Sequence, residues 1–162
     1  MKRRRPGASV AKANGRMVAV QEEKLSLGQL DRHLGYFLRR LQIRVFQDFI
    51  QKLDTFKVRP AQYSVLLIIE ANPGRSQAAI GQMLGIERAG LSRLLQELER
   101  RKWIARLTSG SDARSRCLYL TVDGEKALAK IKSLAEQHEA LLADHLGHKR
   151  HTQLMDSLRG FG

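Results

Sequence analysis

The sequence has little cysteine and no long hydrophobic run. Cys117 is the single cysteine among 162 residues, which excludes a disulfide within the chain and fits a reducing cytosol. No apolar run reaches the length of about 18 residues that a membrane-spanning helix needs. The basic N-terminus is not followed by the hydrophobic segment of a secretory signal. These absences predict a cytoplasmic protein with no membrane partner.

Acidic residues are also scarce. Lys and Arg total 29 against 16 Asp and Glu, which gives a formal net charge of +13. Such an excess predicts a polyanionic partner, with nucleic acid first and an anionic membrane surface second. The hydrophobic share of 43% is ordinary for a globular protein. The length allows one compact domain, or one domain with arms.

The first 16 residues contain no acid and are rich in small residues. Their cations are Lys2, Arg3, Arg4, Arg5, Lys12 and Arg16. This composition predicts a flexible arm over residues 1–25. The arm is either a solvated tail or a segment that follows phosphates or enters a minor groove.

Helical spacing begins after this arm. Ser26 and Gln29 have the spacing of a capping box, so we expect a long helix to begin at Ser26. Its apolar residues are Leu27, Leu30, Leu34, Phe37, Leu38, Leu41, Val45 and Phe49. Pro60 suits the first turn of a second, strongly apolar helix, which the sequence Asn72-Pro73-Gly74 ends.

Two helices and a hairpin are expected next. Ser76 caps a short helix that Gly85 ends, and a further helix follows almost at once. In that helix one buried stripe is formed by Leu91, Leu94, Leu95 and Leu98. Two strands are predicted at 103–108 and 116–120, with a polar turn over 109–115 between them. Thr121 caps a long helix that Gly147 interrupts, and a last helix closes the chain.

A helix, a glycine turn, a second helix and a basic hairpin follow one another in the sequence, and this order is typical of a DNA-binding protein. The second helix of such a pair fits the major groove. Arg88, Ser92 and Arg93 supply donors on its outer face, whereas Glu97 and Glu99 fall to its flanks. Arg114, at the predicted hairpin tip, suits a narrow minor groove. The alternative is an ordinary surface hairpin.

Residues 58–128 resemble the core of the MarR family of transcription regulators. The matching segments are 58–66, 72–77, 83–86, the helix Leu91-Ser92-Arg93-Leu94-Leu95-Gln96-Glu97-Leu98-Glu99-Arg100-Arg101, the wing tip Asp112-Ala113-Arg114, and 120–124. Ala89-Gly90 replaces the small hydroxyl residues often found early in the family's recognition helix, so base contacts there are expected to differ. Lys102 stands where the family usually has glycine, which puts the local turn geometry in question.

The resemblance implies a mostly α fold, a winged helix-turn-helix with a small β-hairpin wing, acting as a homodimer on double-stranded, pseudo-palindromic DNA. We expect a basic arm over 1–25, a dimerisation helix over 26–56, the winged lobe over 57–121 and C-terminal dimerisation helices over 122–162. The predicted DNA-binding residues are Arg75, Ser76, Arg88, Ala89, Gly90, Ser92, Arg93, Gln96 and Arg114.

The resemblance also implies a small-molecule effector that releases the DNA. Residues 31–42 are similar to the first helix of the subgroup that responds to hydroxycinnamate-like aromatic acids or aromatic acyl-CoA thioesters. The predicted effector-binding residues are His33, Tyr36, Phe37, Arg39 and Arg40. Their rings suit an aromatic group and their cations suit carboxylate or phosphate. The alternative is that the rings belong to the dimer core and the cations face solvent or DNA.

No pattern predicts a catalytic residue, a metal site or a cofactor. A lone cysteine such as Cys117 is more often inert than a redox sensor. Four histidines, at positions 138, 145, 148 and 151, have no Cys or Glu cluster to complete a tetrahedral metal site. The sequence therefore favours a ligand-responsive repressor over an enzyme. The alternative function is a ligand-independent, DNA-architectural protein, which the arm and the net charge also fit.

Overall fold

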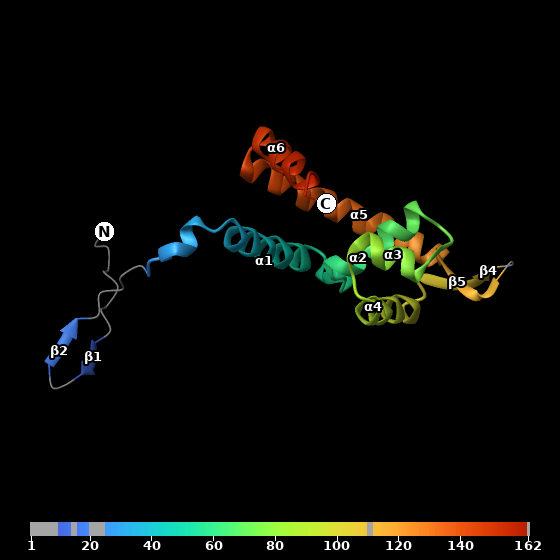
Figure 1. The fold of residues 1–162 in the computed structure, drawn as a ribbon, viewed down its shortest axis with the longest axis horizontal. Helices are drawn as coiled ribbons and strands as arrows, with labels where there is room; N and C mark the ends of the chain where they lie inside the picture. Colours follow the sequence, from blue (N-terminus) through green and yellow to red (C-terminus); the bar gives the residue numbers. More distant parts are fainter. Residues whose placement is uncertain (1–9, 14–15, 20–24, 110–111, 162) are drawn as a thin grey trace. The chain divides into compact units, whose positions relative to one another are not determined.

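The computed structural model describes residues 10–13, 16–19, 25–109 and 112–161. The chain divides into two units, residues 1–40 and 41–162, and each is described by itself. Figure 1 shows the elements in chain order. They are β1 (Val10–Ala13), β2 (Arg16–Ala19), the 3-10 helix η1 (Gly28–Arg32), α1 (Leu34–Lys52), the 3-10 helix η2 (Asp54–Phe56), α2 (Pro60–Ala71), β3 (Arg75–Ser76), α3 (Gln77–Leu84), α4 (Arg88–Arg100), β4 (Ile104–Ser109), β5 (Asp112–Leu120), α5 (Val122–Leu146) and α6 (His148–Arg159). None of the helices in the described ranges is long and apolar enough to cross a membrane.

The first unit differs from the sequence-based expectation in two places. Within the stretch expected to be a flexible arm, β1 and β2 form an antiparallel pair. The expected capping box at Ser26 is not formed: the Ser26 hydroxyl accepts from the Gly28 N–H at 3.1 Å, and the first helical element is the 3-10 helix η1, which begins at Gly28 with φ 55°. His33 has extended backbone, with φ −102° and ψ 107°, and α1 begins only at Leu34. An extended residue interrupts the i to i−4 hydrogen bonds, so one predicted helix becomes two elements.

In the second unit, α2, α3 and α4 enclose the main hydrophobic core. Its buried members are Val65, Leu66, Ile69, Ile80, Leu91, Leu95, Leu98, Ile104, Leu118 and Leu128. The predicted stripe on α4 is confirmed for three of its leucines, which are at most 1% exposed, while Leu94 is half-buried. Burial of this stripe fixes which face of α4 turns outward.

The predicted residues that begin α2 and that begin and end α3 are confirmed. Pro60 is the first residue of α2. The Ser76 hydroxyl accepts from the Ala79 N–H at 3.3 Å and so caps α3. Gly85 ends α3 in the left-handed region at φ 62°, a conformation in which glycine carries no Cβ penalty.

A three-stranded antiparallel sheet in the order β3-β5-β4 forms the wing. Strand β5 begins at Asp112, so Asp112–Ser115 lies in a strand and the prediction of a turn over 109–115 is wrong there. Pairing of Ser109 with Asp112 across a register shift extends the hairpin. The two-residue strand β3, which the sequence did not predict, pairs Arg75 with Leu118. The prediction of a mostly helical fold with a small β wing is confirmed.

A second core joins α1 to α5. It contains Phe49, Leu53, Val58, Ile131 and Ala135. The predicted cap of α5 is confirmed, since the Thr121 hydroxyl accepts from the Gly124 N–H at 3.0 Å. Gly147, at φ 81°, separates α5 from α6 as expected.

Lys102, which replaces a glycine usual in the resembled family, lies in the left-handed region at φ 59°. Its carbonyl oxygen accepts from the Thr121 hydroxyl, and its N–H donates to the Glu99 carbonyl at 2.8 Å. The turn between α4 and β4 therefore keeps a glycine-type geometry despite the lysine side chain. A non-glycine residue in this region is disfavoured because its Cβ crowds the backbone.

Lys102→Gly is expected to raise the free energy of unfolding by about 1 kcal/mol, because glycine adopts this backbone without strain. Thermal unfolding of the full chain measures the effect, which corresponds to a rise in Tm of about 2–4 °C. Arg100→Gly, two residues earlier in a helical position, is the matched control and should lower stability by about 1 kcal/mol. Equal losses from both substitutions would show that Lys102 is not strained.

Candidate nucleic-acid interface

The outward face of α4 is basic. Because the leucine stripe faces the core, the opposite side chains are exposed, and these are Arg88, Ala89, Arg93, Gln96 and Arg100. Gly90 and Ser92 are half-buried, and a Cβ on Gly90 would lie 3.6 Å from the Ile86 side chain. A helix with such a face can enter a major groove, where arginine is the commonest reader of guanine.

The acids of α4 are held by partners inside the lobe. Glu97 accepts a hydrogen bond from the Gln62 side-chain amide of α2 at 2.6 Å. The Glu99 carboxylate lies 2.9 Å from Arg106 Nε of β4. The N–H groups of Arg106 are not aligned with that carboxylate, so among the described residues Nε and Nη2 have no hydrogen-bond partner. Both acids are half-buried, which is consistent with their predicted place on the flanks of the helix.

A tight turn sets α4 against α3. The Ile86 N–H donates to the Gly81 carbonyl at 2.9 Å across this turn. A Cβ on Gly81 would lie 3.2 Å from both the Ile86 carbonyl oxygen and the Leu91 side chain. Glycine at 81 therefore allows the close approach of the two helices. Arg75 is exposed just before α3, whereas the Ser76 hydroxyl is occupied as the α3 cap.

Arg114, predicted at the hairpin tip, lies within strand β5. The tip itself, residues 110–111, lies outside the described residues, as does the side chain of Arg114. The backbone places this residue two positions into β5, past the Ser109 to Asp112 pairing. The wing therefore brings a basic residue close to the end of the hairpin.

Of the five residues predicted to bind an effector, all on the first unit, three contact one another: Tyr36, Phe37 and Arg40. The rings of Tyr36 and Phe37 meet edge to face, with centroids 5.3 Å apart. Arg40 donates to the Tyr36 hydroxyl at 3.2 Å and its guanidinium lies 5.9 Å from that ring's centroid. His33 and Arg39 are exposed. None of these five side chains lines either of the two cavities of the second unit described next.

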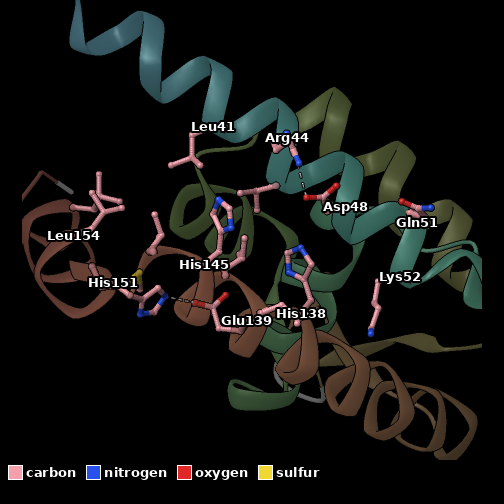
Figure 2. A pocket seen from close by; sticks show the side chains of 16 residues that line it. Leu41, Arg44, Asp48, Gln51, Lys52, His138, Glu139, His145, His151 and Leu154 are labelled. Carbon is pink, nitrogen blue, oxygen red and sulfur yellow. Dashed lines mark hydrogen bonds and ion pairs between the residues drawn. The ribbon is translucent and has the colours of Figure 1, made fainter. Parts of the chain in front are cut away.

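A cavity of about 960 Å³ lies between α1, α5 and α6. Figure 2 shows that His138 and His145 of α5 point toward α1 across it, and that His151 of α6 reaches Glu139. The distance from His151 Nε2 to Glu139 Oε1 is 2.7 Å. Leucines of all three helices supply most of its apolar wall. The sequence did not predict a cavity here, because the cavity forms only where segments about 100 residues apart in the chain contact each other.

A second cavity, of about 370 Å³, lies between α1, α2 and α5. Its walls are Val45, Phe46, Phe49, Pro60, Tyr63, Ser64, Ala135, Glu136, His138 and Glu139. Burial raises the pKa of the Tyr63 phenol, so this group is a neutral hydroxyl near pH 7. His138 is only 7% exposed, and its Nε2 has no hydrogen-bond partner among the described residues. The cavity thus combines aromatic walls with a few polar groups, the usual composition of a small-molecule site.

Within the described residues, no three His, Cys, Asp or Glu side chains are grouped so that they could hold a metal ion. Cys117 is half-buried in β5, opposite Leu107 and Ser76 in the two neighbouring strands.

Comparison with known proteins gives consistent results. The MarR family profile matches residues 56–115. A transcriptional repressor, CouR, solved with a 23-mer DNA duplex, is 41% identical, with a TM-score of 0.82 and coverage of 86% of this chain and 99% of that one. The same repressor bound to p-coumaroyl-CoA is 39% identical, with a TM-score of 0.79 and coverage of 85% and 97%.

A curated relative from Thauera aromatica, described as a putative transcriptional regulatory protein for the hcr operon, is 37% identical over 106 residues. That alignment covers 65% of this chain and 64% of the relative, so the chain spans just under two thirds of that protein's length.

Proposed function

Since the chain belongs to the MarR family of transcription regulators, we propose that it is a repressor of an aromatic-compound catabolism operon and leaves its DNA when an aromatic acid or its CoA thioester binds. The observation that carries the DNA-binding part is the outward face of α4. Three arginines are exposed there, while Glu97 and Glu99 are engaged with Gln62 and Arg106 inside the lobe. Within Arg88–Arg100 the outward face is therefore free of carboxylates, and the exposed Glu87, just before α4, lies at the positive end of the helix dipole.

The proposed DNA contacts divide into two kinds. Arg93 and Gln96, on the exposed face of α4, read base edges in the major groove. Arg75, Arg88 and Arg114 contact phosphates or the adjacent minor groove and so fix the register on the duplex. Ala89, Gly90 and Ser92 are small, so they allow α4 to approach the bases closely. The backbone of Ser76, at the start of α3, contributes a further contact to the DNA.

The proposed active species is a homodimer. Helices α1, α5 and α6 expose more apolar side chain than a monomer in water normally shows, including Ile43, Phe46, Ile50, Leu141, Met155 and Leu158, which are 37–58% exposed. A second copy would cover these faces. Two copies of α4 would then read two half-sites about one turn of DNA apart, roughly 34 Å.

The effector site is proposed in the 370 Å³ cavity between α1, α2 and α5. Its volume suits one aromatic ring with a short side chain, and Tyr63 and His138 are placed to meet a polar substituent. Support comes from CouR, which was solved with p-coumaroyl-CoA. On the first unit, His33, Tyr36, Phe37, Arg39 and Arg40 stay a separate set of proposed effector contacts, because their cations suit thioester phosphates and the paired Tyr36 and Phe37 rings suit an aromatic group.

This assignment predicts that p-coumaroyl-CoA stabilises the protein. A ligand at 100 times its Kd raises the free energy of unfolding by about 2.7 kcal/mol, so Tm should rise by about 5–10 °C in thermal unfolding. Ala135→Leu fills the cavity and should abolish the rise, whereas Ala129→Leu, the same change at an exposed position of α5, should keep it. CoA alone is the ligand control. A full rise in Ala135→Leu would place the effector elsewhere.

A further inference from the structure

The C-terminal half of α4 is hydrogen-bonded to the segment that joins α1 to α2. We call this segment, residues 53–62, the α1–α2 joint. Gln62 is 1% exposed, and its side-chain amide donates to Glu97 Oε2 at 2.6 Å. Its side-chain oxygen accepts from the Arg59 N–H at 3.0 Å. One buried amide thus connects the first turn of α2 to the recognition helix.

Arg101, directly after α4, makes a second connection to the joint. Its Nη1 donates to the Phe56 carbonyl at 2.7 Å and its Nη2 donates to the Lys57 carbonyl at 2.8 Å. The guanidinium also lies over the Trp103 ring, 5.0 Å from the centroid. The planar guanidinium thereby fixes both distance and direction between α4 and the joint.

The other side of the joint is fixed to the dimerisation helices. Leu53 is fully buried and Val58 is 2% exposed, and both belong to the core shared by α1 and α5. The joint therefore has the apolar core shared by α1 and α5 on one side, and three side-chain hydrogen bonds to Glu97 of α4 and to Arg101 on the other.

We infer that Gln62 and Arg101 are positioning residues that set the orientation of α4 relative to α1, and with it the spacing of the two half-sites that the dimer accepts. This inference rests on the proposed binding of a dimer to paired half-sites and is independent of the effector. Neither residue needs to touch DNA, because each acts on the direction in which α4 projects.

The test uses the full chain and duplexes selected by the wild-type protein from a random pool. Kd is measured on the selected duplex and on duplexes with one base pair added or removed between the half-sites. Each base pair changes the separation by about 3.4 Å and rotates one half-site by about 35°. We expect the wild type to bind the altered duplexes about tenfold more weakly than the selected one, and we call this ratio of Kd values the spacing penalty. Gln62→Met and Arg101→Met keep side-chain bulk without the hydrogen bonds. Their spacing penalty should be at least threefold smaller than that of the wild type.

Matched variants separate positioning from stability. Lys132→Met breaks the Lys132 to Glu70 ion pair, which joins α5 to α2 without reaching α4, and should keep the wild-type spacing penalty. Arg101→Lys keeps the charge and one hydrogen bond, so its penalty should fall between those of the wild type and Arg101→Met. If Arg101→Met does not fold, the spacing penalties of Gln62→Met and Arg101→Lys are compared with that of the wild type instead.

A lower Tm with an unchanged spacing penalty in the Gln62 and Arg101 variants would overturn the inference, because it would assign these residues to stability alone. A wild type that selects no paired half-sites would overturn the proposed dimeric DNA binding, and the inference with it.

Discussion

Gly124→Ala is expected to lower the free energy of unfolding by about 3 kcal/mol, one of the largest single-residue effects in this fold. A Cβ at this position would lie 1.9 Å from the Trp103 carbonyl oxygen and 2.8 Å from its carbon. Both are backbone atoms, so no side-chain rotation relieves the clash. The start of α5 or the end of the α4–β4 turn has to move.

The surrounding hydrogen bonds make that movement costly. The same Trp103 carbonyl accepts from the Thr121 N–H at 3.0 Å, and the Thr121 hydroxyl caps α5 through the Gly124 N–H. A shift that makes room for a methyl group therefore disturbs the cap and the pairing between the wing and α5.

Thermal unfolding measures the prediction, with an expected fall in Tm of about 6–12 °C. Gly35→Ala is the control, because a Cβ there has no atom within 4 Å and the residue lies in α1. It should leave Tm unchanged or raise it slightly. A Gly124→Ala protein as stable as the wild type would mean that the contact with Trp103 relaxes freely.

Arg93→Ala is expected to weaken binding to specific DNA roughly 100-fold. A bidentate arginine contact to guanine contributes about 1–3 kcal/mol, and a dimer presents Arg93 twice. Arg93 is exposed on α4, on the face opposite the buried leucines. Binding to random DNA should fall by less than about tenfold, because there the side chain contributes only charge.

The measurement is fluorescence anisotropy on the DNA upstream of the protein's own gene and on a scrambled duplex, at one fixed salt concentration. Lys130→Ala removes the same charge from an exposed position on α5 and should change both affinities little. Equal losses on the two duplexes for Arg93→Ala would assign Arg93 to phosphate contact and remove its base-reading role.

Local signals were sufficient to predict most helix ends and the core face of α4. Pro60, Ser76 and Gly85 act within one turn of their own positions, so the chain near them determines the structure. The leucine spacing of α4 likewise follows from helix geometry alone. The two strands of the hairpin were also predicted from local residue patterns, whereas the left-handed backbone of Lys102 was not predicted, because its sequence position only put the turn geometry in question.

Features that depend on distant segments were not predictable in the same way. Strand β3 exists because Arg75 pairs with Leu118, and the partner of Glu97 is 35 positions away at Gln62. The 370 Å³ cavity needs three helices to be assembled before any wall exists. The break at His33 was not predicted either, since the apolar spacing from Leu27 to Phe49 continues through this extended residue without a local stop signal.

The most direct test of the proposed function is DNA binding with and without effector. The protein is titrated onto the DNA upstream of its own gene and onto a scrambled duplex, in the absence and presence of p-coumaroyl-CoA and other aromatic acyl-CoA thioesters. A ligand-responsive repressor binds the upstream DNA selectively and leaves it when one of the thioesters is added. Equal binding to both duplexes, unchanged by every thioester, would contradict the account and favour a DNA-architectural role.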